Sequence, residues 1–346
     1  MSDSSDALEY SVDIAAADAA VERIKAHVRS TFRPEVLSEL GGFGGLFAFD
    51  NHGYASPVLV GTTDGVGTKS HIARLMHRYD TIGIDLVAMS VDDLAVQGAQ
   101  PLFFLDYIST GKLDPAMMDA LVDGVANGCR QAGCALIGGE MSEHPGLMEP
   151  GEFDLVGFAV GVVDRDAILP RDVRAGDAII GFASPGLRSN GYSLARAALL
   201  ERARFALDAP AWPGAQRSLG EELLTPSVIY APAMLELRGR VGVHAFAHIT
   251  GGGLPGNVVR VLPSDCDAVI TRGTWDVPRI FSVIQAAGTI APAEMERVFN
   301  CGVGMVAIVP GHEVGAALEV LEGSGHAAWR IGDVQSGSGQ VHLVDS

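Results

Sequence analysis

Hydrophobic and polar positions alternate along this chain with the periods of helices and strands, in irregular order. Apolar residues three and four apart predict helices, and short apolar or β-branched runs predict strands. In the first half these are helix 12–29, strand 57–63, helix 80–97, strand 102–108, helix 114–131, strand 135–137 and strand 154–163. They form one α+β unit that closes near residue 170.

A segment with turn residues and no periodicity, residues 169–176, separates this unit from a second one. The sequence therefore predicts two domains, residues 1–170 and 171–346, of α+β or α/β class. Predicted elements of the second are strand 178–183, helices 192–204 and 227–237, strand 243–249, helix 255–261, strand 268–271, helix 277–286, strand 303–309, helix 314–321 and strands near Trp329 and His342.

Composition excludes several classes of protein. The 346 residues are 48% hydrophobic and 19% charged, which is typical of a globular chain and excludes general disorder. The formal net charge of −18 would repel a phosphate backbone, so we expect no nucleic-acid partner. Any anionic ligand must be held locally, by backbone N–H groups, a few basic side chains or a divalent cation.

Compartment and membrane signals are absent from the sequence pattern. The four cysteines form no C-x-x-C pair, so we expect reduced thiols. The acidic first six residues do not resemble a secretory signal, and no apolar run approaches the roughly 18 residues that span a bilayer. We expect a cytoplasmic protein without a membrane segment.

The segment Asp64-Gly-Val-Gly-Thr-Lys69 follows a predicted strand. It is not a P-loop, because Thr68 stands where Walker A requires glycine. Two glycines still allow backbone N–H groups to approach a phosphate, Lys69 supplies a positive charge, and Asp64 suits a hard cation. The alternative is an ordinary turn with a surface lysine.

Three acids lie in the otherwise apolar predicted helix 80–97. Asp85 and Asp92, seven positions apart, share a face, whereas Asp92 and Asp93 point about 100° apart. Acids among buried apolar residues carry a desolvation cost unless a cation lies opposite. One of the adjacent pair is therefore expected to ligate metal while the other caps or pairs. The alternative is a solvated helix face.

Three further segments place polar groups beside predicted strand ends. Residues 138–146 bring Glu140 and Glu143 to one loop, a donor set that favours magnesium over zinc. Residues 187–193 and 250–256 each precede a predicted helix, whose N-terminal N–H groups favour anions. Simple N-capping is the alternative for Ser189 and Asn190. The G-x-G-x-x-G at 251–256 is not read as a dinucleotide site, because Pro255 interrupts it and the preceding strand contains two histidines.

Taken together, these segments resemble the phosphoribosylformylglycinamidine cyclo-ligase family over nearly the whole chain. At two places the chain departs from the family pattern: Arg188 stands where histidine is frequent, and the loop 141–148 differs. The matching segments are GGFGG (41–45), TDGVGTK (63–69), TIGIDLVAM (81–89), PLFFLDY (101–107), TGKLD (110–114), GGE (138–140), SNGYSL (189–194), AHITGGG (247–253) and FNCGVGM (299–305).

The resemblance implies an ATP-dependent ring closure in purine biosynthesis. ATP would phosphorylate the formamide oxygen of formylglycinamidine ribonucleotide, and a nitrogen of the same substrate would displace phosphate to give aminoimidazole ribonucleotide. It also implies a homodimer, in which the N-terminal domains form a β-barrel across the interface, with a C-terminal α/β sandwich packed against it.

The resemblance implies a role for particular residues as well. ATP would contact Gly42, Gly44, Gly45, Asp64, Gly65, Gly67, Thr68, Lys69 and Gly139, with Mg²⁺ held by Asp64 and by Asp92 or Asp93. The substrate phosphate would lie at Ser189, Asn190 and Gly191 or at Thr250, Gly251, Gly252 and Gly253. The expected catalytic residues are Lys69, Asp106, Glu140 and His248.

Other families that share this fold are the alternatives to this assignment. A selenophosphate synthetase would carry a reactive cysteine near its N-terminal glycine loop, and this chain has none before Cys129. A hydrogenase-maturation dehydratase ends in cysteine, unlike this chain. Formylglycinamidine synthase is far longer or needs a glutaminase. A thiamine-monophosphate kinase is the nearest alternative enzyme, and a catalytically inactive nucleotide-binding regulator is the alternative from another class.

Overall fold

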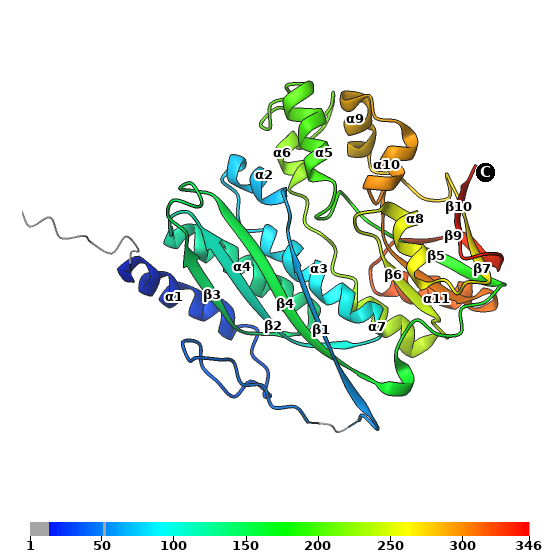
Figure 1. Cartoon of the computed structure of the whole chain (residues 1–346), viewed down its shortest axis with the longest axis horizontal. Coiled ribbons are helices and arrows are strands. Elements are labelled where there is room, and N and C mark those ends of the chain that lie inside the picture. The colour runs from blue at the N-terminus through cyan, green and yellow to red at the C-terminus, as the bar shows by residue number, and fades with distance from the viewer. Residues whose placement is uncertain (1–13, 51–52, 346) are drawn as a thin grey trace, which may run out of the picture.

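The computed structural model describes residues 14–50 and 53–345 and contains two mixed β-sheets, one in each half of the chain (Figure 1). The first sheet has the order β1-β4-β2-β3. In it β2 and β3 are parallel, and the other pairs are antiparallel. Its strands are β1 (Pro57–Gly65), β2 (Gln100–Thr110), β3 (Ala135–Glu143) and β4 (Phe153–Asp164).

Helices cover one face of the first sheet. α3 (Ile82–Val96) packs against β1 and β4 and is almost entirely buried, because its residues are apolar on nearly every side. α4 (Pro115–Ala132) lies beside it. Asp114 caps its start, with a side chain that accepts from the Ala116 N–H, and Gly133, with a φ of 70°, caps its end. α1 (Ile14–Arg29) packs on α4, and the short α2 (Lys69–Met76) follows β1.

The other face of the first sheet is open. No described helix lies over it, and in Figure 1 the strands lie in front of α1, α3 and α4. Leu59, Tyr107, Val156 and Phe158 are exposed there by 63%, 37%, 39% and 43%. Exposed apolar side chains that share one sheet face are typical of an interaction surface.

The second sheet forms the core of the C-terminal half. Its order is β10-β7-β9-β5-β8-β6, with β8 buried along its whole length. Its strands are β5 (Asp177–Ala183), β6 (Ala245–His248), β7 (Cys266–Thr271), β8 (Val303–Pro310), β9 (Ala328–Ser336) and β10 (Val341–Val344). The helices are α5 (Tyr192–Arg196), continued by a π-helical segment to Arg202, α6 (Leu219–Leu223), α7 (Ala231–Arg240), α8 (Gly253–Val258), α9 (Arg279–Gly288), α10 (Pro292–Val298) and α11 (Val314–Gly323).

The structure confirms the predicted elements and moves some of their ends. β3 extends to Glu143, so Glu140 and Glu143 lie in a strand rather than in the expected loop. The three short helices α2, α6 and α10 were not predicted. Val12, the expected start of the first helix, and the N-terminal residues judged for a signal lie outside the described residues. The boundary at 170 stays a prediction.

The cysteines and the helix lengths of the described residues add two findings. All four cysteines are free, and three of them are buried. None of the described helices combines the length and hydrophobicity needed to cross a bilayer.

Candidate active site

The three acids of α3 lie along the seam between the two halves of the chain. Asp85 accepts a hydrogen bond from the Ser227 N–H at 2.9 Å and pairs with Lys69, whose Nζ lies 2.8 Å from Oδ2. Lys69 also donates to the Thr225 carbonyl at 2.8 Å. Asp85 therefore binds Lys69 and a group of the C-terminal half instead of solvent.

Lys69 is not placed to bind a phosphate. Its side chain is 0% exposed, and the ammonium is committed to Asp85 and to the Thr225 carbonyl. Burial lowers the Lys69 pKa, and the Asp85 carboxylate opposes that effect. This corrects both roles expected for Lys69, in catalysis and in ATP binding. The lysine is a buried structural residue between the two halves of the chain.

Asp92 is not placed to hold a metal ion either. Its Oδ1 accepts from the Tyr230 and Ala231 N–H groups at 2.8 and 2.9 Å, and so caps α7 from the other domain. Its Oδ2 accepts from Arg188 at 2.8 Å. Burial raises the Asp92 pKa, whereas Arg188 and His248 oppose the rise. The expectation of Asp92 as a metal ligand is corrected, because its oxygens are already occupied.

Asp93 and Asp64 are the carboxylates that remain for a cation. The Asp93 side chain is 45% exposed, and its Oδ1 lies 2.8 Å from His248 Nδ1. Burial raises the Asp64 pKa, the Gly65 N–H lowers it, and the nearby Asp93 raises it further. Two interacting carboxylates fit Mg²⁺, which takes one or two from a protein and completes its shell with phosphate and water. The described residues contain no cluster of three metal-ligating side chains.

Three glycine-containing segments meet beside these acids. Thr68 Oγ1 lies 3.3 Å from Ser193 Oγ, and a Cβ on Gly67 would lie 3.5 Å from the Ser189 carbonyl. A Cβ on Gly251 would lie 3.8 Å from Asn190 Nδ2. The structure therefore brings together residues 65–68, 189–193 and 250–253. Ser189 Oγ and Asn190 Oδ1 are buried and have no hydrogen-bond partner in the described structure.

The other predicted residues line a separate cavity of the N-terminal half. This cavity of about 550 Å³ is bounded by the glycine loop 41–45, by Asp106 and by the start of β3, including Gly139 and Glu140. Its size is that of a small-molecule site. A Cβ on Gly139 would lie 1.8 Å from Asp106 Oδ1, so only glycine at position 139 leaves room for the Asp106 side chain. Burial raises the Asp106 pKa to about 7. Asp106 Oδ2 has no partner among the described residues.

The strand register of the first sheet shows how Asp64, beside the glycine segments, lies relative to Asp106 in the cavity. Asp64 on β1 pairs with Gly157 on β4, which pairs with Asp106 on β2, which pairs with Gly139 on β3. Residues directly opposite one another point to the same face, so both acids face the helix layer. Two strand spacings separate them, about 10 Å.

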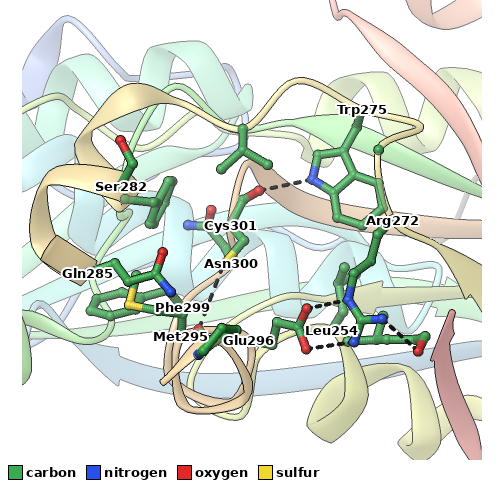
Figure 2. A pocket seen from close by; sticks show the side chains of 15 residues that line it. Leu254, Arg272, Trp275, Ser282, Gln285, Met295, Glu296, Phe299, Asn300 and Cys301 are labelled. Atoms are coloured by element: carbon green, nitrogen blue, oxygen red, sulfur yellow. Dashed lines mark hydrogen bonds and ion pairs between the residues drawn. The ribbon is translucent and has the colours of Figure 1, made fainter. Parts of the chain in front are cut away.

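A further pocket lies in the C-terminal half, away from these acids (Figure 2). Trp275, Phe281 and Phe299 line it, and its polar residues are paired, as Figure 2 shows for Arg272 with Glu296. Trp275 Nε1 donates to the Cys301 carbonyl at 2.9 Å. This pocket offers apolar contact without an unpaired polar group, so it is not the site of the chemistry.

Sequence reasoning missed the role of Arg188. Its guanidinium is buried between Asp92, His248 and the Val228 carbonyl. The signal that points to it is the unexplained acid on the buried face of α3, which requires a cation opposite.

Comparison with known proteins agrees with the fold and with the matched segments. Residues 51–163 match the family model "AIR synthase related protein, N-terminal domain", and residues 174–345 match the corresponding C-terminal domain. A phosphoribosylformylglycinamidine cyclo-ligase of Trichlorobacter lovleyi is 51% identical over 95% of this chain and 94% of its own length. That of Anaeromyxobacter sp. strain Fw109-5 is 53% identical over 95% and 96%.

Solved structures of lower identity share the fold. Thiamine-monophosphate kinase from Stenotrophomonas maltophilia superposes with a TM-score of 0.68 at 21% identity, over 94% of this chain and 95% of that one. Hydrogenase maturation protein HypE in complex with ATP gives 0.62 at 19%, over 94% and 91%. Sequence identity near 20% shows a shared fold alone, whereas identity above 50% over nearly the full length shows membership of the same family. The chain belongs to the phosphoribosylformylglycinamidine cyclo-ligase family of AIR synthase related proteins.

Proposed function

We propose that this protein closes the imidazole ring of aminoimidazole ribonucleotide from formylglycinamidine ribonucleotide, with conversion of ATP to ADP and phosphate. The formamide oxygen takes the γ-phosphoryl group as the bond to ADP breaks. A substrate nitrogen then bonds to the activated carbon, and the carbon–oxygen bond breaks to release phosphate. The activation is needed because an amide oxygen otherwise leaves as hydroxide or water.

The observation that carries this proposal is the meeting of two carboxylates with three glycine segments at the seam. Phosphoryl transfer needs positioning and charge neutralisation more than a covalent nucleophile on the protein. Asp64 and Asp93 supply the ligands of a Mg²⁺ ion, which would neutralise phosphate charge when bound. The glycines let backbone N–H groups approach phosphate oxygens.

We assign ATP and the phosphate of the second substrate to different groups of residues. ATP binds between the glycine-loop cavity, with Gly42, Gly44, Gly45, Asp106, Gly139 and Glu140, and the segment of Asp64, Gly65, Gly67 and Thr68. The substrate phosphate binds at residues 189–191 and 250–253, where the buried Ser189 and Asn190 oxygens have no hydrogen-bond partner among the described residues. Asp106, Glu140 and His248 stay the proposed catalytic side chains. An acidic protein must hold such anions by local dipoles, because its overall field repels them.

We also propose that the protein is a homodimer in the cytoplasm, and the open face of the first sheet supports the dimer. Apolar surface that is exposed on one sheet face is costly to leave in water, and this face exposes Leu59, Tyr107, Val156 and Phe158. A second copy that brings the same face against this one would bury them and complete a barrel between subunits.

The proposed function is tested by measuring ADP and aminoimidazole ribonucleotide together, with formylglycinamidine ribonucleotide or thiamine monophosphate as the second substrate. We expect equal amounts of both products with the first and no ADP with the second. Asp64→Asn and Asp93→Asn should abolish both products at ordinary Mg²⁺, while exposed Glu201→Gln serves as a matched control. ADP formed only with thiamine monophosphate would establish the kinase instead.

A further inference from the structure

Arg196, the last residue of α5, is a cation that has no partner among the described residues. Its Nε is buried and makes no hydrogen bond there, and its guanidinium pairs with no described acid. The side chain is partly buried, and a charged group that is partly removed from water without a partner costs free energy. An anionic ligand would remove that cost, so Arg196 is a candidate for ligand binding.

His71 of α2 lies beside Arg196. Thr68 Oγ1 and Ser193 Oγ are 3.3 Å apart, so α2 and α5 meet at these two residues. Residues three apart on a helix share a face. His71 and Arg196 therefore lie one helical turn, about 5.4 Å, beyond the contact, on the sides by which the two helices face each other.

The charge around His71 is mostly positive. Its Nδ1 lies 3.4 Å from Arg74 Nη2. Burial lowers the His71 pKa, and the charges of Arg196 and Arg74 lower it further. Glu152 opposes this effect, but it is 41% exposed and lies 3.9 Å from Arg74 Nη1. A chain with a net charge of −18 thus has a local excess of positive charge between α2 and α5.

The segment that leads into α5 contributes an unused hydroxyl. Ser189 is 7% exposed, and its Oγ has no hydrogen-bond partner within the described structure. Side chains of a helix lean toward its N-terminus, so Arg196 extends back along α5 toward this segment. Arginine, histidine and a hydroxyl can all donate hydrogen bonds to phosphate oxygens, and arginine matches phosphate geometry in particular.

We propose that Arg196, His71 and Ser189 bind the phosphate group of the ribonucleotide substrate. The inference rests on the proposed function and deepens it, because it names the cations that hold this phosphate beside residues 189–191. The phosphates of ATP are the other source of the same chemistry.

The position of the site favours the ribonucleotide over ATP. In the proposed reaction the γ-phosphoryl group lies next to the formamide, beside Asp64 and Asp93. The substrate's own phosphate is separated from the formamide by the ribose, so it requires a site away from these acids. Arg196 lies in the C-terminal half, beyond the contact of Thr68 with Ser193, whereas ATP is assigned to the cavity of the N-terminal half.

The test is calorimetric titration of the ligand-free full-length protein with ribose 5-phosphate, with ribose as the uncharged match and ATP as the second phosphate source. Arg196→Met removes the charge and keeps the length of the apolar stem. In this variant we expect Kd for ribose 5-phosphate to rise about tenfold to a hundredfold, as for a lost hydrogen bond to a charged group. Kd for ATP should not change. Arg196→Lys should lose less affinity than Arg196→Met.

The matched control is Arg240→Met, which removes the same charge from a side chain on α7 that is 68% exposed. It should bind ribose 5-phosphate as the natural chain does. An equal loss of affinity in this control would mean that overall charge, and not the site, determines binding.

Unfolding measurements distinguish a ligand site from a structural role. Because Arg196 has no acid partner in the ligand-free protein, Arg196→Met should leave the free energy of unfolding unchanged or raise it. Ribose 5-phosphate should then stabilise the natural chain and Arg240→Met, but not Arg196→Met. A variant that is less stable without ligand would show that Arg196 supports the fold instead.

The inference is overturned if the natural chain binds ribose 5-phosphate no better than ribose, or if Arg196→Met weakens ATP binding in its place. These measurements need no turnover. In the cyclisation assay Arg196→Met should raise KM for the ribonucleotide and leave KM for ATP unchanged. If the calorimetry gives the expected result and no cyclisation is found, the proposed function is rejected and the sugar-phosphate site stands.

Discussion

The Asp92 carboxylate on α3 accepts a hydrogen bond from the Arg188 guanidinium at 2.8 Å, although the two residues are 96 positions apart and lie in different domains. The next residue, Asp93, is turned toward partly exposed space and His248. Adjacent acids thus have separate tasks, one in joining the domains and one in the site.

Substitutions at these two neighbouring acids should therefore differ in their effects on stability and on activity. Asp92→Ala should lower the free energy of unfolding by about 3–5 kcal/mol, because it leaves a buried arginine unpaired. Asp93→Ala should lower it by less than about 1 kcal/mol, since its side chain is partly in solvent, but should abolish activity. Urea unfolding and a turnover assay on both variants check this, and equal stability losses would remove the distinction.

The substrate phosphate site is tested best at Gly251. Gly252 has a φ of 102°, so any side chain there strains the backbone whatever the ligand does. Gly251 does not have a positive φ, and its Cβ would meet Asn190 Nδ2 only at 3.8 Å. Gly251→Val should raise KM for the nucleotide substrate by about tenfold or more and leave KM for ATP nearly unchanged.

The matched control for that variant is Gly256→Val, because a Cβ at Gly256 meets nothing within 4 Å. A rise in KM for ATP in Gly251→Val would show that the two phosphate sites are assigned to the wrong segments.

Asp106 should make the ligand-free protein less stable as the pH rises. Burial raises its folded pKa to about 7, above the ordinary value of 3.8. The native state therefore holds this proton more tightly than the unfolded chain, and the stabilisation is lost as pH rises through about 7. Asp106→Asn cannot ionise, so its free energy of unfolding should gain up to roughly 4 kcal/mol relative to the natural chain between about pH 4 and pH 8.

Denaturant unfolding of both proteins across that pH range provides the measurement. A difference that does not change with pH would mean that Asp106 is ionised throughout and is not the buried acid described here.

The dimer proposal predicts that charge on the open sheet face prevents association. Leu59→Glu places a carboxylate at a side chain that is 63% exposed in the single chain, so folding should be nearly unaffected. Sedimentation should then find a dimer for the natural chain and a monomer for the variant. A natural chain that sediments as an active monomer would contradict the proposed barrel.

Periodicity located nearly all of the helices and strands, because each buries one continuous apolar face. Periodicity failed where contacts with distant parts of the chain determine the structure. α7 was expected from residue 227 but begins at Ala231. The N–H groups of Ser227 and Tyr230, just before it, are bound by Asp85 and Asp92 of the other domain. The short α2, α6 and α10 carry too few turns for a pattern to be visible.

The candidate site shows the same limit. Residue types indicated that acids and glycines hold a phosphate and a cation, and motif order indicated the family. Which of Asp92 and Asp93 is available depends on where Arg188 reaches after folding, and Lys69 is withdrawn from the site by Asp85. Such pairings across 96 and 16 positions are tertiary contacts that spacing does not encode.

The central claim is that ATP activates the formamide oxygen of the substrate. It is tested most directly by mass spectrometry of the phosphate released from formylglycinamidine ribonucleotide that carries oxygen-18 in its formyl group. The account predicts one labelled oxygen in each phosphate formed with aminoimidazole ribonucleotide, because that oxygen bonds to phosphorus before it leaves carbon. Unlabelled phosphate formed alongside the ring-closed product would contradict it.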